Sequence, residues 1–355
     1  MPDPSVKTLR APEYSPEERE AILDYLMALR SREIRAFLEA HDLAVSGTKP
    51  ELRERVGETL EEGDLTHADL IRWVDRYESW AKQHVFLYSG PEGHAIGEWR
   101  DIGWVAQHLR EHKVHRYLNA VLPLILPPQL RLSSILHTGQ ILRIVAVERR
   151  DYSERVVELD EGRETDSGEE IELRAYVRHV KRGLVTFEWD LTANNAMLQI
   201  SQLPSGTKYE DVAGGFEKLV GPWLDLRMFI LLGIRPSIAR LHELEESGQA
   251  EARSHAFGYA SPGGRRVTGL SPSSVDSMVG EAEFDDAMRR IRQHGVGHLG
   301  NFYWLATTVD PSLNNPLERE VHTYLVASKG RVAFPAQNTE AEVRYVLSRV
   351  RTLSV

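Results

Sequence analysis

The hydrophobic pattern of this 355-residue chain changes its period near Ile141. Before that residue, apolar side chains recur at the spacing of a helix; after it, they alternate with polar side chains, as in half-buried strands. The alternating segments are ILRIVAVERR, RVVELDE, EIELRAYVRHVKR, LVTFEWDL and NAMLQISQL. We expect them to form an antiparallel meander with turns between the segments, one of them at 181–183. The sequence therefore predicts an α+β fold, in which a small N-terminal helical module precedes a larger mixed domain with an antiparallel sheet.

The chain after residue 203 mixes both periods. Helices are predicted over 208–234, 236–247 and 339–351, and strands over 250–260, 301–310, 321–330 and 331–336. Glycine, proline and serine cluster at the joints between such segments. We divide the chain into a helical module over 20–63, a helical connecting region over 64–135 and an α+β domain with antiparallel strands over 136–355.

Composition narrows the function classes. The chain contains no cysteine, which excludes disulfides, thiolate nucleophiles and zinc sites with sulfur ligands. It has no run of about 18 apolar residues, and its first residues show neither the apolar stretch nor the cleavage site of a signal peptide. We therefore expect a cytoplasmic protein without membrane contact.

The net charge of −10 is concentrated in one segment. Ten acidic and two basic residues lie between Asp151 and Glu172, a local net charge of −8, which leaves about −2 for the rest of the chain. Such a run is typical of a solvated hairpin tip. A near-neutral remainder can still present a basic face, so the overall charge does not exclude a nucleic-acid partner.

The stretch DLAVSGTKPELRERV joins two predicted short helices. Apolar spacing predicts the first helix over 32–41, with Ser31 as its cap. Asp42 follows where the helix must end, and aspartate tolerates the left-handed conformation found at such ends. Leu43 and Val45 are then expected to turn into the core as the chain crosses to the second helix.

The second helix is predicted to begin within Ser-Gly-Thr-Lys-Pro. Ser46 or Thr48 can cap it, and Pro50 lies in the first turn, where a missing N–H costs little. The free N–H groups and the dipole of a helix start, with Lys49 beside them, make an anion site, and phosphate is the usual anion. Arg53 adds a charge one turn further on, so the sequence predicts a phosphate contact here.

This arrangement resembles the SAP module, a small DNA-binding unit. The matching residues are Ser31, Ile34, Phe37, Leu38, Leu43, Ser46, Gly47, Lys49, Leu52 and Arg55, with Asp42 in place of the family's usual glycine. The tetrapeptide Ser-Gly-Thr-Lys recurs at 205–208, but without the helix that precedes the first copy. The resemblance implies contacts with DNA phosphates that do not depend on base sequence. The residues assigned to these contacts are Arg32, Arg35, Ser46, Gly47, Thr48, Lys49 and Arg53.

A second resemblance concerns the order of elements. The segment that begins at Thr66 predicts a helix with an apolar and aromatic stripe, formed by Leu70, Trp73, Val74, Tyr77 and Trp80. The helix leads through a glycine-rich turn toward alternating segments such as FEWDLTANNAMLQISQL. This layout is similar to that of the centromere protein N family, in which a small helical domain leads through an aromatic-bearing helix into a strand-rich domain.

Histidines occur in two places at a spacing that could form a metal site or a ligand site. His108, His112 and His115 can share one helical face, a geometry that suits a metal, but the charged residues around them favour a solvated face. His294 and His298 lie in a glycine-rich stretch that is more typical of a turn than of a ligand cradle.

One pair of carboxylates has the spacing of a catalytic site. Glu188 and Asp190 project to the same face of a predicted strand. Paired carboxylates suit a metal-dependent nuclease, although no lysine follows at strand spacing. The chain has no Walker loop, nucleophile elbow or dinucleotide fingerprint. We therefore expect no metal site and no cofactor, and a binding protein rather than an enzyme.

These observations predict a DNA-associated binding or adaptor protein. The N-terminal module would hold phosphates, and the larger domain would dock a protein partner or continue the DNA contact. The alternative is a metal-dependent nuclease, or a related nucleic-acid enzyme, that is tethered by the same module and uses Glu188 and Asp190 as ligands. Either role suits a prokaryotic genome-maintenance or defence system.

Overall fold

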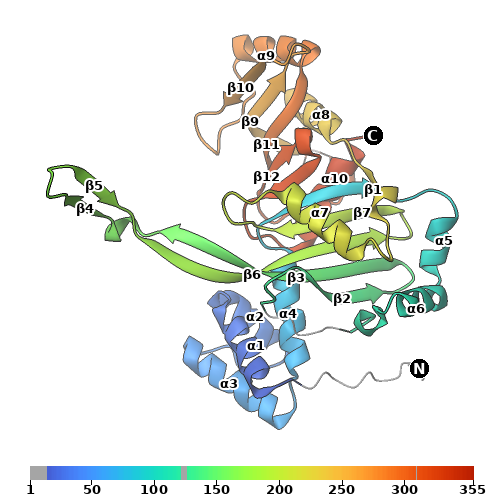
Figure 1. Ribbon diagram of the computed structural model, residues 1–355. Helices are drawn as coiled ribbons and strands as arrows, with labels where there is room; N and C mark the ends of the chain where they lie inside the picture. Colours follow the sequence, from blue (N-terminus) through green and yellow to red (C-terminus); the bar gives the residue numbers. More distant parts are fainter. Residues whose placement is uncertain (1–13, 121–125, 309) are drawn as a thin grey trace.

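A computed structural model describes residues 14–120, 126–308 and 310–355 (Figure 1). The fold is α+β, as the change of hydrophobic period predicts: N-terminal helices lead into a large antiparallel sheet of eleven strands with interspersed helices. None of the helices in these three ranges has the length and hydrophobicity needed to cross a membrane.

The first helices form one helical module. They are α1 (Pro16–Ala28), α2 (Ser31–Ala40), α3 (Lys49–Glu62) and α4 (His67–Ser79). Leu26, Phe37, Val56 and Leu70, one from each helix, are fully buried in a shared core. The buried contacts of the helical module therefore continue through α4, past residue 63.

The sheet collects strands from most of the remaining chain. Its spatial order is β10 (Arg266–Leu270), β9 (Ala252–Ala260), β11 (Val296–Trp304), β12 (Val321–Val326), β13 (Arg331–Phe334), β1 (Gln83–Ser89), β7 (Asn195–Ser201), β6 (Tyr176–Asp190), β3 (Ile141–Arg155) and β2 (Arg131–His137). The short strand β8 (Ile230–Leu231) pairs with β1 outside this order. Strands β4 (Glu161–Glu164) and β5 (Glu170–Leu173) form a separate two-stranded sheet.

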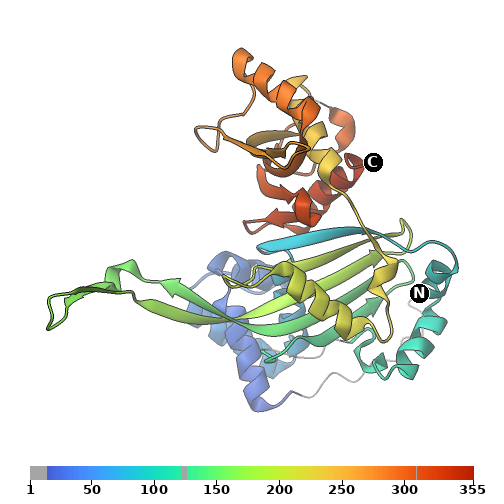
Figure 2. The same cartoon turned by 45° about the horizontal axis from the view of Figure 1, so that its top comes forward.

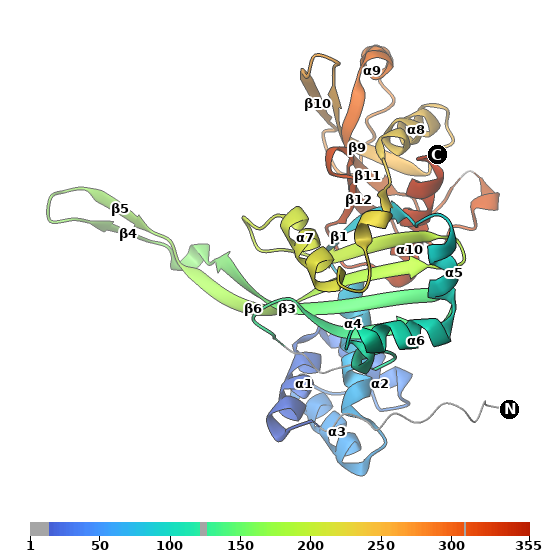
Figure 3. The same ribbon diagram turned by 45° about the vertical axis from the view of Figure 1, so that its right-hand side comes forward.

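Helices cover both faces of the large sheet. The helices are α5 (His94–Arg100), α6 (Ile102–Glu111), α7 (Tyr209–Val220), α8 (Arg235–Glu246), α9 (Ala282–His294) and α10 (Glu340–Thr352). Phe187 and Trp189 of β6 pack in one core with residues of α5, α6 and α7. Because side chains alternate along a strand, Arg182 and Glu188 of β6 point the other way, where they meet α4 and α10. Figure 3 shows α7 and the helical module on opposite sides of the sheet.

A buried ion cluster joins the helical module to the sheet. The Arg182 guanidinium contacts the carboxylate of Asp75 and lies 3.2 Å from that of Glu78, and only 5% of the Arg182 side chain is exposed. The Arg182 backbone N–H also donates to the Tyr25 hydroxyl at 2.6 Å. One arginine cannot neutralise two buried carboxylates, and burial raises the pKa of Glu78 to about 7.

This cluster explains why the turn predicted at 181–183 is wrong. Strand β6 runs without interruption through these residues, and Arg182 pairs with Arg149 of β3 in the ladder. The Lys-Arg-Gly sequence indicated a break between strands, but the charge of Arg182 is compensated by carboxylates more than a hundred residues earlier in the chain.

Two further expectations differ from the structure. The connecting region over 64–135 is not purely helical, since β1 lies in the middle of the sheet between β7 and β13. Its Val85, Phe86 and Leu87 are all buried, and a short apolar run of this kind has no period that separates strand from helix. The helix predicted over 208–234 ends at Val220, and the chain beyond it returns to the sheet as β8.

The ion cluster predicts a pH dependence of stability. Glu78 keeps its proton in the folded state up to a pKa of about 7 and releases it in the unfolded state near its ordinary value of 4.5. The folded state therefore binds more protons at this site, so the contribution of Glu78 to stability is greatest below pH 4.5 and falls until the pH passes about 7. We expect Glu78→Gln to remove up to about 1.4 kcal/mol per pH unit of this slope, measured by urea unfolding between pH 5 and 8. Equal slopes for both proteins would contradict the assignment.

Candidate functional site

The predicted pair of short helices and the crossover between them are present. Helix α2 ends at Ala40, α3 begins at Lys49, and the crossover comprises residues 41–48. Asp42 has the expected left-handed conformation, with φ of 57°. Leu43 packs against the core of the helical module, but Val45 is 40% exposed, so its predicted burial is wrong.

The start of α3 is capped from within the chain. Thr48 is the cap, and its backbone N–H and hydroxyl donate to the Glu51 carboxylate at 2.6 and 3.0 Å. These hydrogen bonds lower the pKa of Glu51. Ser46 and Gly47 lie in the crossover beside this cap, with Gly47 at φ of 120°. The helix start expected to receive a phosphate thus already holds a carboxylate of its own.

Three cations bind the backbone around the crossover. Arg35 donates to the carbonyls of Val45 and Gly47 at 3.2 and 3.3 Å. Arg55 donates to those of Ala44 and Ser46 at 2.6 and 3.0 Å. Lys49 donates to the carbonyls of Met27 and Leu29, where α1 gives way to α2, at 3.1 and 2.8 Å. All these acceptors are neutral carbonyl oxygens. The hydrogen bonds therefore hold each cation in place without compensating its positive charge.

The other two predicted cations have carboxylate partners. Arg53 contacts both Asp24, at 2.6 Å, and Glu20 on α1. Arg32 lies 3.3 Å from Glu33, although its side chain remains 87% exposed. Arg35, Ser46, Gly47, Thr48 and Lys49 lie at or beside the crossover, whereas Arg32 lines a separate groove and Arg53 contacts α1. The charges of Arg35 and Lys49 are uncompensated by a carboxylate in the described ranges, and that of Arg53 is compensated twice.

A groove of about 680 Å³ lies between the helical module and the segment that leads into α10, and, of the predicted cations, Arg32 lines it. Arg30, which directly follows the backbone bound by Lys49, lines it together with Arg76 of α4. Trp73 and Tyr77 of α4 contribute aromatic side chains to the same wall. Within the described ranges, neither Arg30 nor Arg76 has a carboxylate within salt-bridge distance.

The groove also contains carboxylates, and most of them are paired. They are Glu33, Glu318, Glu340 and Glu342. Glu342 is bound by Arg319 at 2.8 Å, Glu340 by Arg344 at 2.7 Å, and Glu33 by Arg32. The cations without an acidic partner thus lie on the α2 and α4 side of the groove, and the paired charges lie mostly on the α10 side.

Three of these cations, Arg55, Arg30 and Arg76, were not among the residues that the sequence assigned to phosphate contacts. Arg55 could have been included from the sequence, because it is one of the residues that match the SAP pattern. Arg30 and Arg76 come together only because α4 packs beside the start of α2, and no local pattern in the sequence indicates that contact.

The three histidines near α6 do not meet as one group, although the rings of His108 and His112 are neighbours with centroids 4.7 Å apart. His108 is held by the Trp223 carbonyl, 2.7 Å from Nε2, and stacks on Trp104. His112 is the cap residue of α6, and His115 begins a separate 3₁₀ turn. In the three described ranges, no group of three or more His, Asp or Glu side chains has a geometry suited to a metal ion.

The other histidines and carboxylates considered as site residues also lie in structural positions. His294 ends α9, and His298 lies within strand β11 rather than in a loop. Glu188 is buried and receives two hydrogen bonds from Arg344, at 2.7 and 3.0 Å. Asp190 accepts backbone N–H groups from the turn after β6. Both carboxylates are thus engaged in structural contacts.

Comparison with known proteins gives no identification: no protein-family model matches the chain, and no curated protein matches it.

The contribution of the buried core to the stability of the helical module can be measured separately from that of its surface. Phe37 is fully buried, and its ring packs edge-on against Trp73 with centroids 5.6 Å apart. We expect Phe37→Ala to lower the free energy of unfolding of the helical module by about 3–5 kcal/mol, so that hydrogen exchange quickens in α1–α4. Val45→Ala, in the exposed crossover, should change stability by less than about 0.5 kcal/mol. Equal effects of the two substitutions would contradict the core described here.

Proposed function

We propose that this chain is a DNA-associated binding protein whose SAP-like helical module holds the phosphate backbone of duplex DNA. The observation that carries the proposal is the bonding of Arg35, Lys49 and Arg55 to backbone carbonyls alone. A cation with a neutral partner keeps its charge, and its position is fixed before DNA arrives. Such contacts position DNA without reading bases.

The arginines of the groove support the same proposal. Arg30 and Arg76 add two arginines without a carboxylate partner among the described residues, on the wall of the groove that the helical module forms. Arginine presents five donors in a planar fork, and Arg55 uses only one of its terminal nitrogens on the crossover. Its remaining donors are free to bind a phosphate while the crossover stays in place.

The salt dependence of binding tests the proposal. Lys49→Gln removes a proposed phosphate contact, and we expect the log–log salt slope of duplex binding to fall by about 0.9. Arg53→Gln is the matched control, because it removes the same charge from a residue already paired with Asp24 and Glu20. Its slope should stay near that of the wild type. Fluorescence anisotropy with two unrelated duplexes at several salt concentrations measures both slopes.

Two results would contradict the proposal. One is a wild-type protein that binds neither duplex at low salt. The other is a Lys49→Gln protein whose slope equals that of Arg53→Gln, since net charge alone would then explain the effect.

Glu51, the carboxylate at the start of α3, allows a test in which DNA affinity should rise and not fall. Glu51→Gln keeps a capping residue at this position but removes the negative charge beside the crossover cations. We expect DNA affinity to rise roughly two- to fivefold at low salt, because one repulsive charge is lost. Helicity, measured by circular dichroism, should not change. Unchanged or weaker binding at full helicity would show that phosphate does not approach this helix start.

A further inference from the structure

A two-stranded arm extends from the body of the protein (Figure 1). Strands β3 and β6 pair over their whole lengths, from Ile141 with Asp190 to Arg155 with Tyr176. The strands on either side pair with only part of these lengths: β2 pairs with β3 as far as Val147, and β7 pairs with β6 from Val185. The chain between these points, residues 148–184, forms the arm and ends in the β4–β5 hairpin. Figure 2 shows the arm projecting away from the rest of the molecule.

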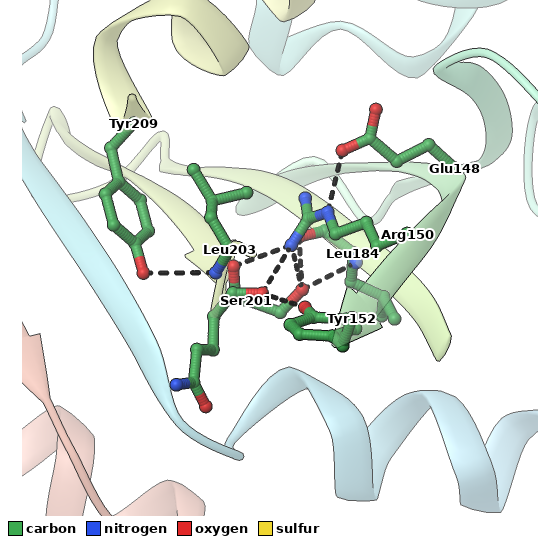
Figure 4. Close-up of polar contacts among 8 residues, drawn as sticks. Glu148, Arg150, Tyr152, Leu184, Ser201, Leu203 and Tyr209 are labelled. Carbon is green, nitrogen blue, oxygen red and sulfur yellow. Dashed lines mark hydrogen bonds and ion pairs between the residues drawn. The ribbon is translucent and has the colours of Figure 1, made fainter. Parts of the chain in front are cut away.

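The root of the arm is held by a buried polar network (Figure 4). Arg150 donates to the carbonyl and hydroxyl of Ser201 at 2.6 and 2.8 Å, and to the Glu148 carboxylate at 2.8 Å. The Tyr152 hydroxyl donates to the Gln202 carbonyl. These contacts tie the arm to the end of β7, so the arm is presented in a fixed direction.

The end of the arm exposes apolar side chains. Val157 and Leu159 are 63% and 62% exposed, and Ile171 and Leu173 are 44% and 42% exposed. Ile171 and Leu173 are two residues apart on β5 and therefore share one face of the hairpin. A two-stranded ribbon has no core of its own in which to bury them.

The opposite face of the hairpin is acidic. Glu164 pairs directly with Glu170, so both project to one side together with Glu172. Eight acidic and two basic residues lie between residues 156 and 175. Arg155 and Arg174 bind Glu172, but within the described ranges Glu164 and Glu170 have no cationic partner. The hairpin thus carries apolar and negative residues in alternation along β5.

We propose that the arm docks an extended segment of another protein in which basic and apolar side chains alternate. Such a segment can add to the hairpin as a further strand, because β4 and β5 pair only with each other and leave their outer edges open among the described strands. Its apolar side chains would cover Ile171 and Leu173, and its lysines or arginines would face Glu164 and Glu170. The net charge disfavours both nucleic acid and a second copy of the same arm.

The test uses the full-length protein and a labelled peptide probe of alternating lysine and valine. In a trimmed variant, Asn-Gly replaces residues 156–175; since Arg155 and Tyr176 are directly paired, this turn closes the shortened hairpin. We expect the trimmed variant and Ile171→Ser/Leu173→Ser to bind the probe at least tenfold more weakly. Val267→Ser/Leu270→Ser, on the exposed edge strand β10, is the matched control and should bind like the wild type.

Other readouts keep the test specific. A lysine–serine peptide of equal charge should bind at least tenfold more weakly than the lysine–valine peptide. DNA binding and the thermal midpoint of the trimmed variant should match the wild type, which separates this inference from the proposed function. Full affinity of the trimmed variant for the probe would overturn the proposal, as would equal binding of the two peptides. A wild-type dimer that dissociates on trimming, measured by light scattering, would instead assign the arm to a second copy.

Discussion

The position of the helical module depends on one buried arginine. Arg182 lies in the middle of β6 and meets two carboxylates of α4, so two parts of the chain that have separate cores are joined by charge rather than by apolar packing alone. Removing charges from water is costly unless each is well paired. The contact therefore favours one docking position, and α4, which carries both carboxylates, also forms one wall of the groove beside the start of α10. The proposed DNA contacts at Arg30 and Arg76 depend on the same position.

Local features of the fold were predictable, and distant pairings were not. The left-handed Asp42 just after α2 and the cap of α3 at Thr48 follow from neighbouring residues: sequence reasoning found the first and offered Thr48 as one of two possible caps. The partners of Lys49 and Arg53 lie twenty or more residues away, on α1 or directly after it, and only the folded chain brings them together. The same reason explains the turn wrongly predicted at Arg182. Strand β1 was missed because an apolar run that is buried on both faces shows no period.

Neighbouring cations of the helical module differ in what they can offer a ligand. Lys49 and Arg53 are one turn apart on α3, yet one binds carbonyls and the other binds carboxylates. Sequence reasoning assigned both to phosphate because it counts charges and not their partners. For a nearly neutral surface, the difference between positioned charge and cancelled charge decides where a polyanion can bind. The location of uncompensated charge also separates the two proposed binding surfaces: DNA at the helical module, and a basic protein segment at the acidic arm.

The place of β1 in the sheet has a consequence for how the protein is made. This strand is synthesised early, but its partners are β7 and β13, and the second of these ends at Phe334. During translation, the apolar residues of β1 must wait until nearly the whole chain has left the ribosome before both edges are paired. The helical module has only local contacts in its core and can form first. Long-range pairing of this kind is slow and leaves strand edges open to aggregation. The early helices thus provide a folded start while the sheet remains incomplete.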